Sequence, residues 1–108
     1  MNKAKQRGFE IRFVYVYVDT LERQLERIRF RVVKGGHDVP ADKVAARRGR
    51  SFRECPWFFW QAHQAWIFDN SGAEPKLVGW KETEHLAEFS GEMIEELFDE
   101  FRDPDRWR

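Results

Sequence analysis

Apolar and polar positions along the chain predict alternating strands and helices. Residues 9–18 (FEIRFVYVYV) begin as an alternating pattern and become continuously β-branched or aromatic, which is typical of a strand covered on both faces of a sheet. Residues 66–69 and 76–80 form shorter predicted strands that are separated by a turn starting at residues 70–72. The pattern therefore predicts an α/β fold with a small, mainly parallel sheet and flanking helices.

Helical periodicity marks the remaining segments. The first helix starts after Asp19, its predicted N-cap, and repeats leucine, isoleucine and valine at helical spacing. Residues 40–54 and 57–65 are predicted as two further helices, because Pro56 lacks the N–H that would continue the ladder between them. Residues 82–103 are predicted as one acidic helix, the main part of a C-terminal segment that begins at residue 81.

Length and composition predict a single domain over residues 1–108, with residues 1–8 as a frayed N-terminus. Hydrophobic residues make up 42% and aromatic residues 16%, which favours a folded protein with a packed core. The net charge is zero, yet residues 1–54 carry 14 Lys+Arg and 7 Asp+Glu, whereas residues 55–108 carry 5 and 12. This asymmetry indicates either internal pairing or an anionic ligand held by the basic half.

The cysteine content and the absence of targeting patterns bear on location. Cys55 is the single cysteine, so no disulfide within the chain is expected. The sequence shows neither a signal-peptide pattern nor a long apolar run, which predicts a cytoplasmic protein without a membrane partner. The histidines and Cys55 lack the spacing of a metal site, so no metal ligand is assigned.

The strongest local signals lie in residues 34–51, KGGHDVPADKVAARRGRS. Gly35 and Gly36 are expected to stop the first helix and to act as a hinge, since glycine adopts backbone angles closed to other residues. His37 is expected to brace this hinge by a hydrogen bond. Pro40 suits the first turn of the following helix. The segment therefore predicts two arginine-bearing helices joined at a glycine hinge.

Three motifs in order carry a family resemblance. They are Gly35-Gly36-His37-x-Val39-Pro40, then Arg47-x-x-Arg50-Ser51, then Asp69-Asn70-Ser71-Gly72. This set, within residues 9–80, resembles the C-terminal half of the zeta-toxin-like P-loop kinases. Members of that family phosphorylate a small substrate with ATP, which in the toxins is a UDP-amino-sugar.

The resemblance implies a nucleotide site. Arg31, Arg47 and Arg50 would approach the ATP phosphates from a hinged lid, and Asp69 and Asn70 would lie near the adenine end. Arginine suits this role because its planar fork of donors matches phosphate oxygens and stays charged at any working pH. ATP with Mg²⁺ is the cofactor that the family implies.

The chain departs from the family in the parts that perform catalysis. It contains no G-x-x-x-x-G-K-[ST] loop, and the catalytic aspartate on the strand after that loop is missing as well. In such kinases these parts cradle the β-phosphate, hold Mg²⁺ and activate the acceptor hydroxyl. No catalytic residue is therefore assigned. The expected function is that of an ATP-contacting lid half, inactive alone or completed by a separate chain that carries the P-loop.

Four consecutive aromatic residues at positions 57–60 predict an interface, because one short helix cannot turn all of them toward a core. Trp57 or Trp60 would lie at its centre, in a homodimer or in a complex with a P-loop chain. One alternative function is a non-catalytic interaction or regulatory module that self-associates through this aromatic face. Another is nucleic-acid binding by stacking beside the arginines, which zero net charge disfavours.

Overall fold

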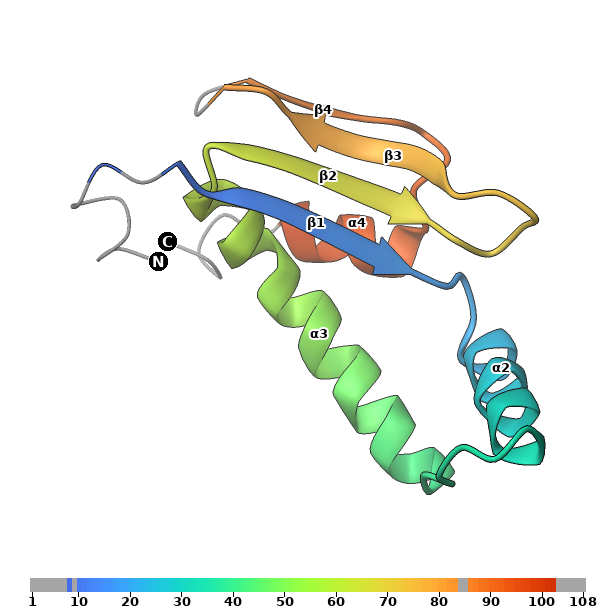
Figure 1. Cartoon of the computed structure of the whole chain (residues 1–108). Coiled ribbons are helices and arrows are strands. Elements are labelled where there is room, and N and C mark those ends of the chain that lie inside the picture. Colours follow the sequence, from blue (N-terminus) through green and yellow to red (C-terminus); the bar gives the residue numbers. More distant parts are fainter. Residues whose placement is uncertain (1–7, 9, 84–85, 103–108) are drawn as a thin grey trace.

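The computed structural model describes residues 8, 10–83 and 86–102, and it shows one sheet with helices on one side (Figure 1). The elements in chain order are β1 (Arg12–Tyr17), α2 (Leu21–Val33), α3 (Ala41–Gln61), β2 (Gln64–Asp69), β3 (Lys76–Lys81), β4 (Ala87–Phe89) and α4 (Glu95–Arg102). We call the sheet, α4 and the half of α3 beside them the body. The arm consists of α2, residues 34–40 and the other half of α3, and it extends away from the sheet.

The sheet is mixed, with the strand order β1-β2-β3-β4. β1 runs parallel to β2, whereas β2–β3 and β3–β4 are antiparallel pairs. The α/β class is thus confirmed, and the prediction of a mainly parallel sheet is wrong. Short connections between β2, β3 and β4 permit only antiparallel neighbours, and the long crossover through α2 and α3 allows the parallel pair.

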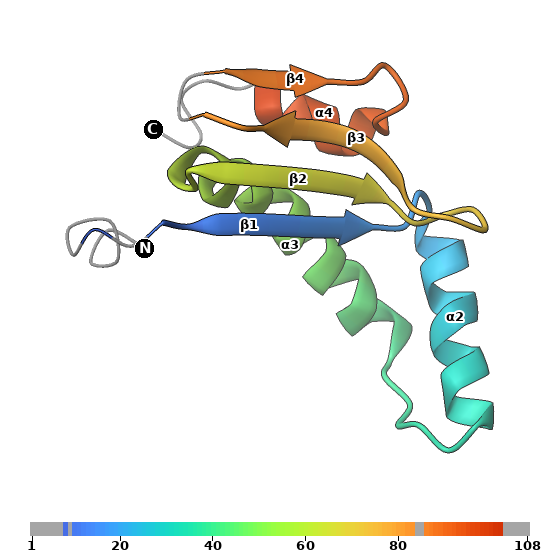
Figure 2. The same ribbon diagram turned by 45° about the horizontal axis from the view of Figure 1, so that its top comes forward.

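Only one face of the sheet is covered by helices in the described part of the chain, as the turned view in Figure 2 shows. Tyr17 on the helix side is buried, whereas Val14 and Val16 are 58% and 53% exposed. The prediction that this strand is covered on both faces is therefore wrong. The apolar run is continuous because Val14 and Val16, which alternate with the helix-facing residues, lie on the uncovered side.

We call the uncovered side of the sheet the open face. Its apolar residues follow from the strand register, since paired residues of neighbouring strands share a face. They are Val14, Val16, Trp66, Phe68, Leu77 and Trp80.

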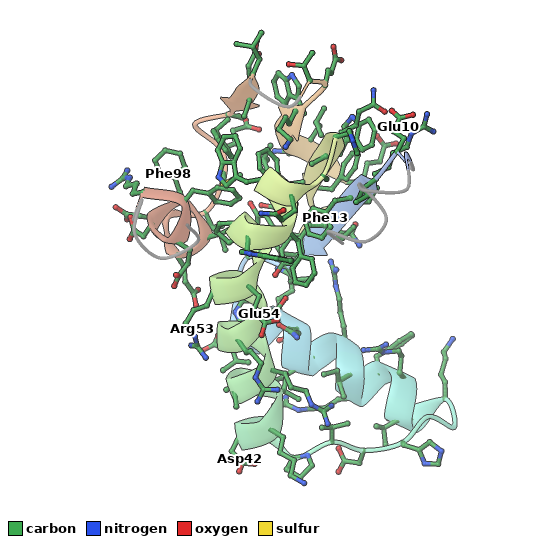
Figure 3. All side chains as sticks on the ribbon, turned by 90° about the vertical axis from the view of Figure 1, so that its left-hand side faces the viewer. Glu10, Phe13, Asp42, Arg53, Glu54 and Phe98 are labelled. Carbon is green, nitrogen blue, oxygen red and sulfur yellow. The ribbon has the colours of Figure 1, made fainter. Side chains whose placement is uncertain are left out.

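The core lies between the sheet, α3 and α4. Phe59 is fully buried, and its ring centroid lies 5.2 Å from that of Phe101 on α4. Phe101 in turn lies 5.0 Å from Phe89 on β4, again between ring centroids. Phe13 extends from β1 on the side that faces α3, whereas Asp42 lies at the end of α3 far from the sheet (Figure 3). Aromatic side chains thus join both helices to the sheet.

α3 is one continuous helix, so the prediction of two helices separated at Pro56 is wrong. A proline inside a helix removes one backbone hydrogen bond, but here the residues around it pack against the sheet. Phe52, Cys55 and Phe59 are all buried at helical spacing on the same side of α3. The free energy of this packing outweighs the local cost of Pro56.

The C-terminal segment also differs from its prediction. Instead of one helix over residues 82–103 the structure has strand β4 followed by helix α4, and residue 103 lies outside the described residues. Phe89 pairs with Gly79 of β3, and the Ser90 N–H donates to the Val78 carbonyl at 2.8 Å. A spacing of four from Phe89 to Met93 to Leu97 imitates a helix. All three side chains pack in the core, but Phe89 reaches it from a strand.

The start of α2 lies one residue later than predicted. Thr20 is the N-cap, and its Oγ1 accepts a hydrogen bond from the Arg23 N–H at 3.1 Å. Asp19 instead accepts a hydrogen bond on its Oδ1 from Nε of Arg23 at 2.9 Å. Pro40 is the residue before the first turn of α3, close to its predicted place. Among the described residues no helix is both long enough and apolar enough to cross a membrane.

Candidate functional site

The two glycines after α2 form a defined helix cap. Gly35 has a φ of 102°, in the left-handed region, and its N–H donates to the Val32 carbonyl at 3.0 Å. The Gly36 N–H donates to the Arg31 carbonyl at 2.8 Å, which completes a Schellman motif. A Cβ at position 36 would lie 2.9 Å from that carbonyl oxygen, so both positions favour glycine. The glycines stop the helix, and hinge motion remains a prediction.

A pocket of about 340 Å³ lies between α2 and α3. We call it the arm pocket, and it is lined by Gln24, Ile28, Arg31, Gly36, His37, Val39, Val44 and Arg47. The first three of these residues recur along one side of α2, and Val44 and Arg47 are three apart on α3. The facing sides of two helices, with the chain between them, therefore enclose the pocket.

Two arginines and no carboxylate line the arm pocket. Within the described part of the chain, neither Arg31 nor Arg47 forms an ion pair, although Arg23 and Arg48 do. Like charges that share a pocket repel each other, so a bound anion would lower the free energy of this arrangement. Guanidinium groups match the oxygens of phosphate in particular.

The structure brings together only some of the residues that the resemblance assigned. Arg31, Arg47, Gly36 and His37 meet at the arm pocket. Arg50 instead lines a neighbouring cavity of about 270 Å³ beside β1, which Arg47 also borders. The hydrogen bond that closes the turn comes from the Gly36 backbone, not from the His37 side chain.

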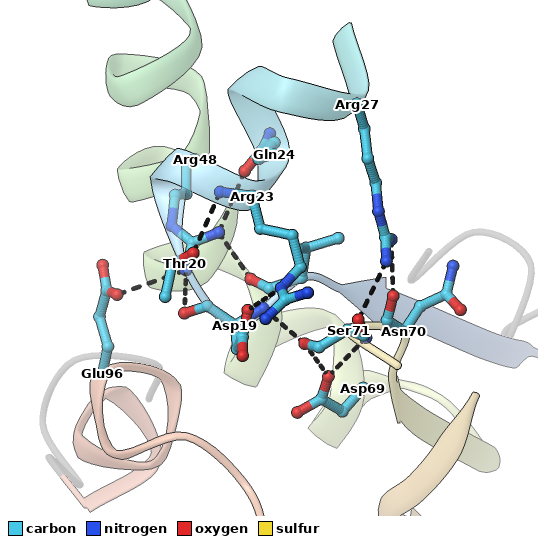
Figure 4. Close-up of polar contacts among 11 residues, drawn as sticks. Asp19, Thr20, Arg23, Gln24, Arg27, Arg48, Asp69, Asn70, Ser71 and Glu96 are labelled. Atoms are coloured by element: carbon cyan, nitrogen blue, oxygen red, sulfur yellow. Dashed lines mark hydrogen bonds and ion pairs between the residues drawn. The ribbon is translucent and has the colours of Figure 1, made fainter. Parts of the chain in front are cut away.

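Asp69 and Asn70 lie at the end of β2, where they hold the turn that follows. Oδ1 of Asp69 accepts a hydrogen bond from the Ser71 N–H at 2.9 Å and another from the Ser71 hydroxyl. Arg27 on α2 donates to the carbonyl of Asn70 at 2.6 Å and to that of Ser71 at 3.1 Å (Figure 4). These residues attach the base of the arm to the sheet. They do not line the arm pocket.

Arg48 is a buried connector that the sequence interpretation missed. It donates to the carbonyls of Val18 at 2.7 Å and Asp19 at 3.0 Å, and to Oε1 of Gln24 at 3.0 Å. Glu96 on α4 lies 3.5 Å away as an ion-pair partner (Figure 4). The signal in the sequence was its position on α3, four residues after Val44 and four residues before Phe52, which are both buried.

Burial beneath the sheet favours the neutral forms of three titratable groups, Tyr15, Tyr17 and Cys55. Burial raises the pKa of Tyr15 and of Tyr17 to about 12. Burial also raises the pKa of the Cys55 thiol, which is 1% exposed, so it does not supply a thiolate nucleophile. For Asp19, partial desolvation raises the pKa, but the hydrogen bond and charge of Arg23 outweigh it and leave the pKa below its ordinary value.

The arm pocket fits a phosphate group but does not fit Mg²⁺, which requires oxygen ligands that usually include carboxylates. Over residues 10–83 and 86–102, no three His, Cys, Asp or Glu side chains are grouped to hold a metal ion. The pocket residues suit binding of an anion. Among the described residues of this lining, His37 is the one side chain of a type that can act as a base.

The two tryptophans predicted at an interface have different surroundings. Trp57 is 37% exposed on α3, and its ring centroid lies 5.0 Å from that of Phe58. Trp60 packs against the core, with the Lys81 ammonium 5.5 Å from its ring centroid. Trp57 is therefore the more accessible of the two. An interface centred on either one remains a prediction.

Comparison with known proteins gives no match to a protein family, a curated protein or a solved structure.

Proposed function

We propose that the arm pocket binds the phosphate groups of a nucleotide such as ATP, and that the chain is the lid half of a zeta-toxin-like small-molecule kinase. The observation that carries this proposal is that Arg31 and Arg47 line the same pocket and that no carboxylate lines it. The family resemblance in the sequence supports ATP as the nucleotide. The single unpaired cysteine suits a cytoplasmic setting.

The proposed role is binding rather than catalysis by this chain alone. Arg31 and Arg47 would neutralise phosphate charge, and the amide of Gln24 offers a further hydrogen-bond donor beside them. A P-loop, Mg²⁺ ligands and an acceptor-activating carboxylate would come from a separate chain. The phosphoryl acceptor in this proposal is a UDP-sugar-like molecule, as in the family.

Calorimetric titration of the purified chain with ATP and with pyrophosphate tests the proposal. Arg31→Ala and Arg47→Ala should each raise Kd by about ten- to a hundredfold, the effect of losing one charge-assisted hydrogen bond. Arg29→Ala is the matched control, because Arg29 is an exposed arginine of α2 that does not line the pocket.

Arg50→Ala tests whether the nucleotide contacts are those of the arm pocket alone or the larger set that the family resemblance implies. Weaker ATP binding by this variant would favour the full set of family contacts, while unchanged binding would restrict the site to the arm pocket. Wild-type protein that binds neither ligand at millimolar concentration would contradict nucleotide binding.

A non-catalytic interaction module is the second candidate function. The specific observation in its favour is the open face, where Val14, Val16 and Leu77 are 58%, 53% and 42% exposed. Apolar surface of this kind on a folded domain commonly marks a place where another molecule binds.

A further inference from the structure

Two further cavities continue the arm pocket along α3. The middle cavity, of about 290 Å³, shares Gln24 and Arg47 with the arm pocket. The third is the cavity of about 270 Å³ beside β1, and it shares Tyr15, Ser51 and Arg47 with the middle one. Because Arg47 borders all three, the cavities adjoin one another from the space between the arm helices to the side of β1. We call the three together the long groove.

The long groove suits a ligand larger than inorganic phosphate. Sites for drug-sized ligands usually measure about 300–1,000 Å³, so each cavity alone is near or below the lower limit. The lining residues of α3 extend from Val44 to Phe58, and a helix rises about 1.5 Å per residue, which gives the groove a length of roughly 20 Å. An elongated molecule can therefore occupy several of the cavities at once.

The lining of the groove is cationic at the arm and carries hydroxyl groups in the middle. In the arm pocket, Arg31 and Arg47 lie among described lining residues that include no carboxylate. In the middle cavity, the hydroxyl oxygens of Tyr15 and Ser51 lie 2.6 Å apart, so one O–H donates to the other and the second O–H stays available to a ligand. Such groups form hydrogen bonds with the hydroxyls of a sugar.

The third cavity has an aromatic wall. Phe13 and Phe58 stack with ring centroids 5.9 Å apart and an angle of 19° between their planes, and the Tyr15 centroid lies 6.1 Å from that of Phe13. All three rings line the cavity and are only partly buried. Stacking on aromatic side chains suits any nucleobase, because every base has a π-face.

Polar groups beside this wall match the edge of a base. The Glu54 carboxylate is exposed and forms no ion pair or hydrogen bond with other described residues, so it can accept from an N–H donor of a ligand. Arg50 lines the same cavity and supplies N–H donors. Nucleobases present both donors and acceptors along their edges, and these two side chains can pair with them.

A nucleotide carries the same kinds of group in the same order, namely charged phosphates, a hydroxylated sugar and a flat base. We propose, on the basis of the nucleotide binding proposed above, that the ribose lies in the middle cavity and the base in the third cavity, stacked on Phe13 and Phe58. The ligand class is then a nucleoside polyphosphate rather than an inorganic one. This placement moves the base away from Asp69 and Asn70, which line none of the three cavities.

Calorimetric titration of the full chain with ATP and with inorganic triphosphate tests the placement, because the two ligands have the same phosphate chain. ATP should bind about ten- to a hundredfold more tightly, the effect of stacking one base on aromatic side chains. Equal Kd values would overturn the placement of the base and leave phosphate binding by the arm pocket intact. Binding of neither ligand would contradict the nucleotide-binding function itself, and the placement with it.

The aromatic wall is tested at Phe58. Phe58→Leu removes the flat ring but keeps an apolar side chain, and it should raise the Kd of ATP by about tenfold while the Kd of triphosphate stays unchanged. Trp57→Leu is the matched control, because Trp57 is the neighbouring aromatic residue of α3 and lines none of the three cavities. Circular dichroism of both variants shows whether the fold is kept.

The edge contact is tested at Glu54, where the exposed position keeps the fold out of the result. By charge alone, Glu54→Gln should tighten the binding of both anions. Loss of a contact with the base should instead raise the Kd of ATP relative to that of triphosphate, by about fivefold. Asp42→Asn is the control, because Asp42 is an exposed acid at the far end of α3 and should leave this ratio unchanged (Figure 3).

Three further outcomes would overturn the placement. One is an unchanged ratio of the two Kd values in Glu54→Gln or in a folded Phe58→Leu variant. Another is an Asn70→Ala variant that loses the preference for ATP, which would put the base at the end of β2. The third is an Arg50→Ala variant that weakens both ligands alike, which would put phosphate rather than the base in the third cavity.

Discussion

The arm and the body are built from similar amphipathic helices, but they bury very different amounts of apolar surface. No residue of α2 is buried, and Phe30 and Val33 are 62% and 85% exposed. In the body, α3 buries Phe59 completely, and α4 buries Leu97 completely. Stability therefore resides in the body. Because the arm contributes little packing, two guanidinium groups without an ion pair among the described residues can line one pocket there at little cost to the fold.

The largest expected effect contrasts one phenylalanine from each region. Phe59→Ala removes a fully buried ring that packs on Phe101, and it should lower the free energy of unfolding by about 3–5 kcal/mol. Phe30→Ala removes a ring from the exposed side of α2 and should change it by less than about 0.5 kcal/mol. Urea denaturation of both variants measures the difference. Equal losses of unfolding free energy in the two variants would contradict the division into a well-packed body and a weakly packed arm.

Arg48 connects the two regions, so its removal should have the next largest effect. Arg48→Met keeps an apolar stem beside Phe52 but leaves the carbonyls of Val18 and Asp19 without their donor. We expect a loss of about 2–4 kcal/mol in the free energy of unfolding. Arg53→Met, at an exposed position of the same helix, is the control and should be nearly neutral. A neutral Arg48→Met variant would show that the arm is attached by other contacts.

The smallest of the three effects depends on pH and belongs to the body alone. Tyr15 and Tyr17 have pKa values raised by burial from 10.0 to about 12, so below pH 10 both phenols are protonated in the folded and unfolded chains. Between those pH values the unfolded chain loses its protons first, and the free energy of unfolding should therefore fall. Urea titrations at pH 9 and pH 11 measure this fall. Tyr17→Phe should make it smaller, and an unchanged slope would contradict the assignment.

The sequence predicted most elements because their periodicity is local. Strand β1, helix α2 and strand β3 lie close to where alternation or helical spacing placed them. β2 begins at Gln64, two residues earlier than predicted, so the predicted helix over residues 57–65 extends too far. β4 was missed because it has only three residues and because Phe89 is four residues before Met93, a helical spacing. Pro56 was read as a helix break because tertiary packing, which offsets its cost, leaves no local signal.

The candidate site was predictable only in part. Arg31 and Arg47 were assigned through a family resemblance, and no spacing rule links two residues on separate helices. Arg48 was assigned no role, although its position among apolar residues on α3 was a local sign of burial. The sequence did not locate the open face, because a continuous apolar run looks the same whether one or both sides of a strand are covered by the same chain.

Pairing β1 with β2 closes a long loop, and closing that loop costs conformational entropy. The Ile11 N–H donates to Nδ1 of His63 at 2.8 Å across a sequence separation of 52 residues, whereas β2 and β3 are joined by residues 70–75 alone. Closing the longer loop costs about 2 kcal/mol more conformational entropy than closing the shorter one. The contacts of three aromatic rings of β1 with α3 offset that cost. The ring centroids lie 5.9 Å apart for Phe13–Phe58, and 6.4 Å and 6.0 Å for Tyr15 and Tyr17 with Phe52.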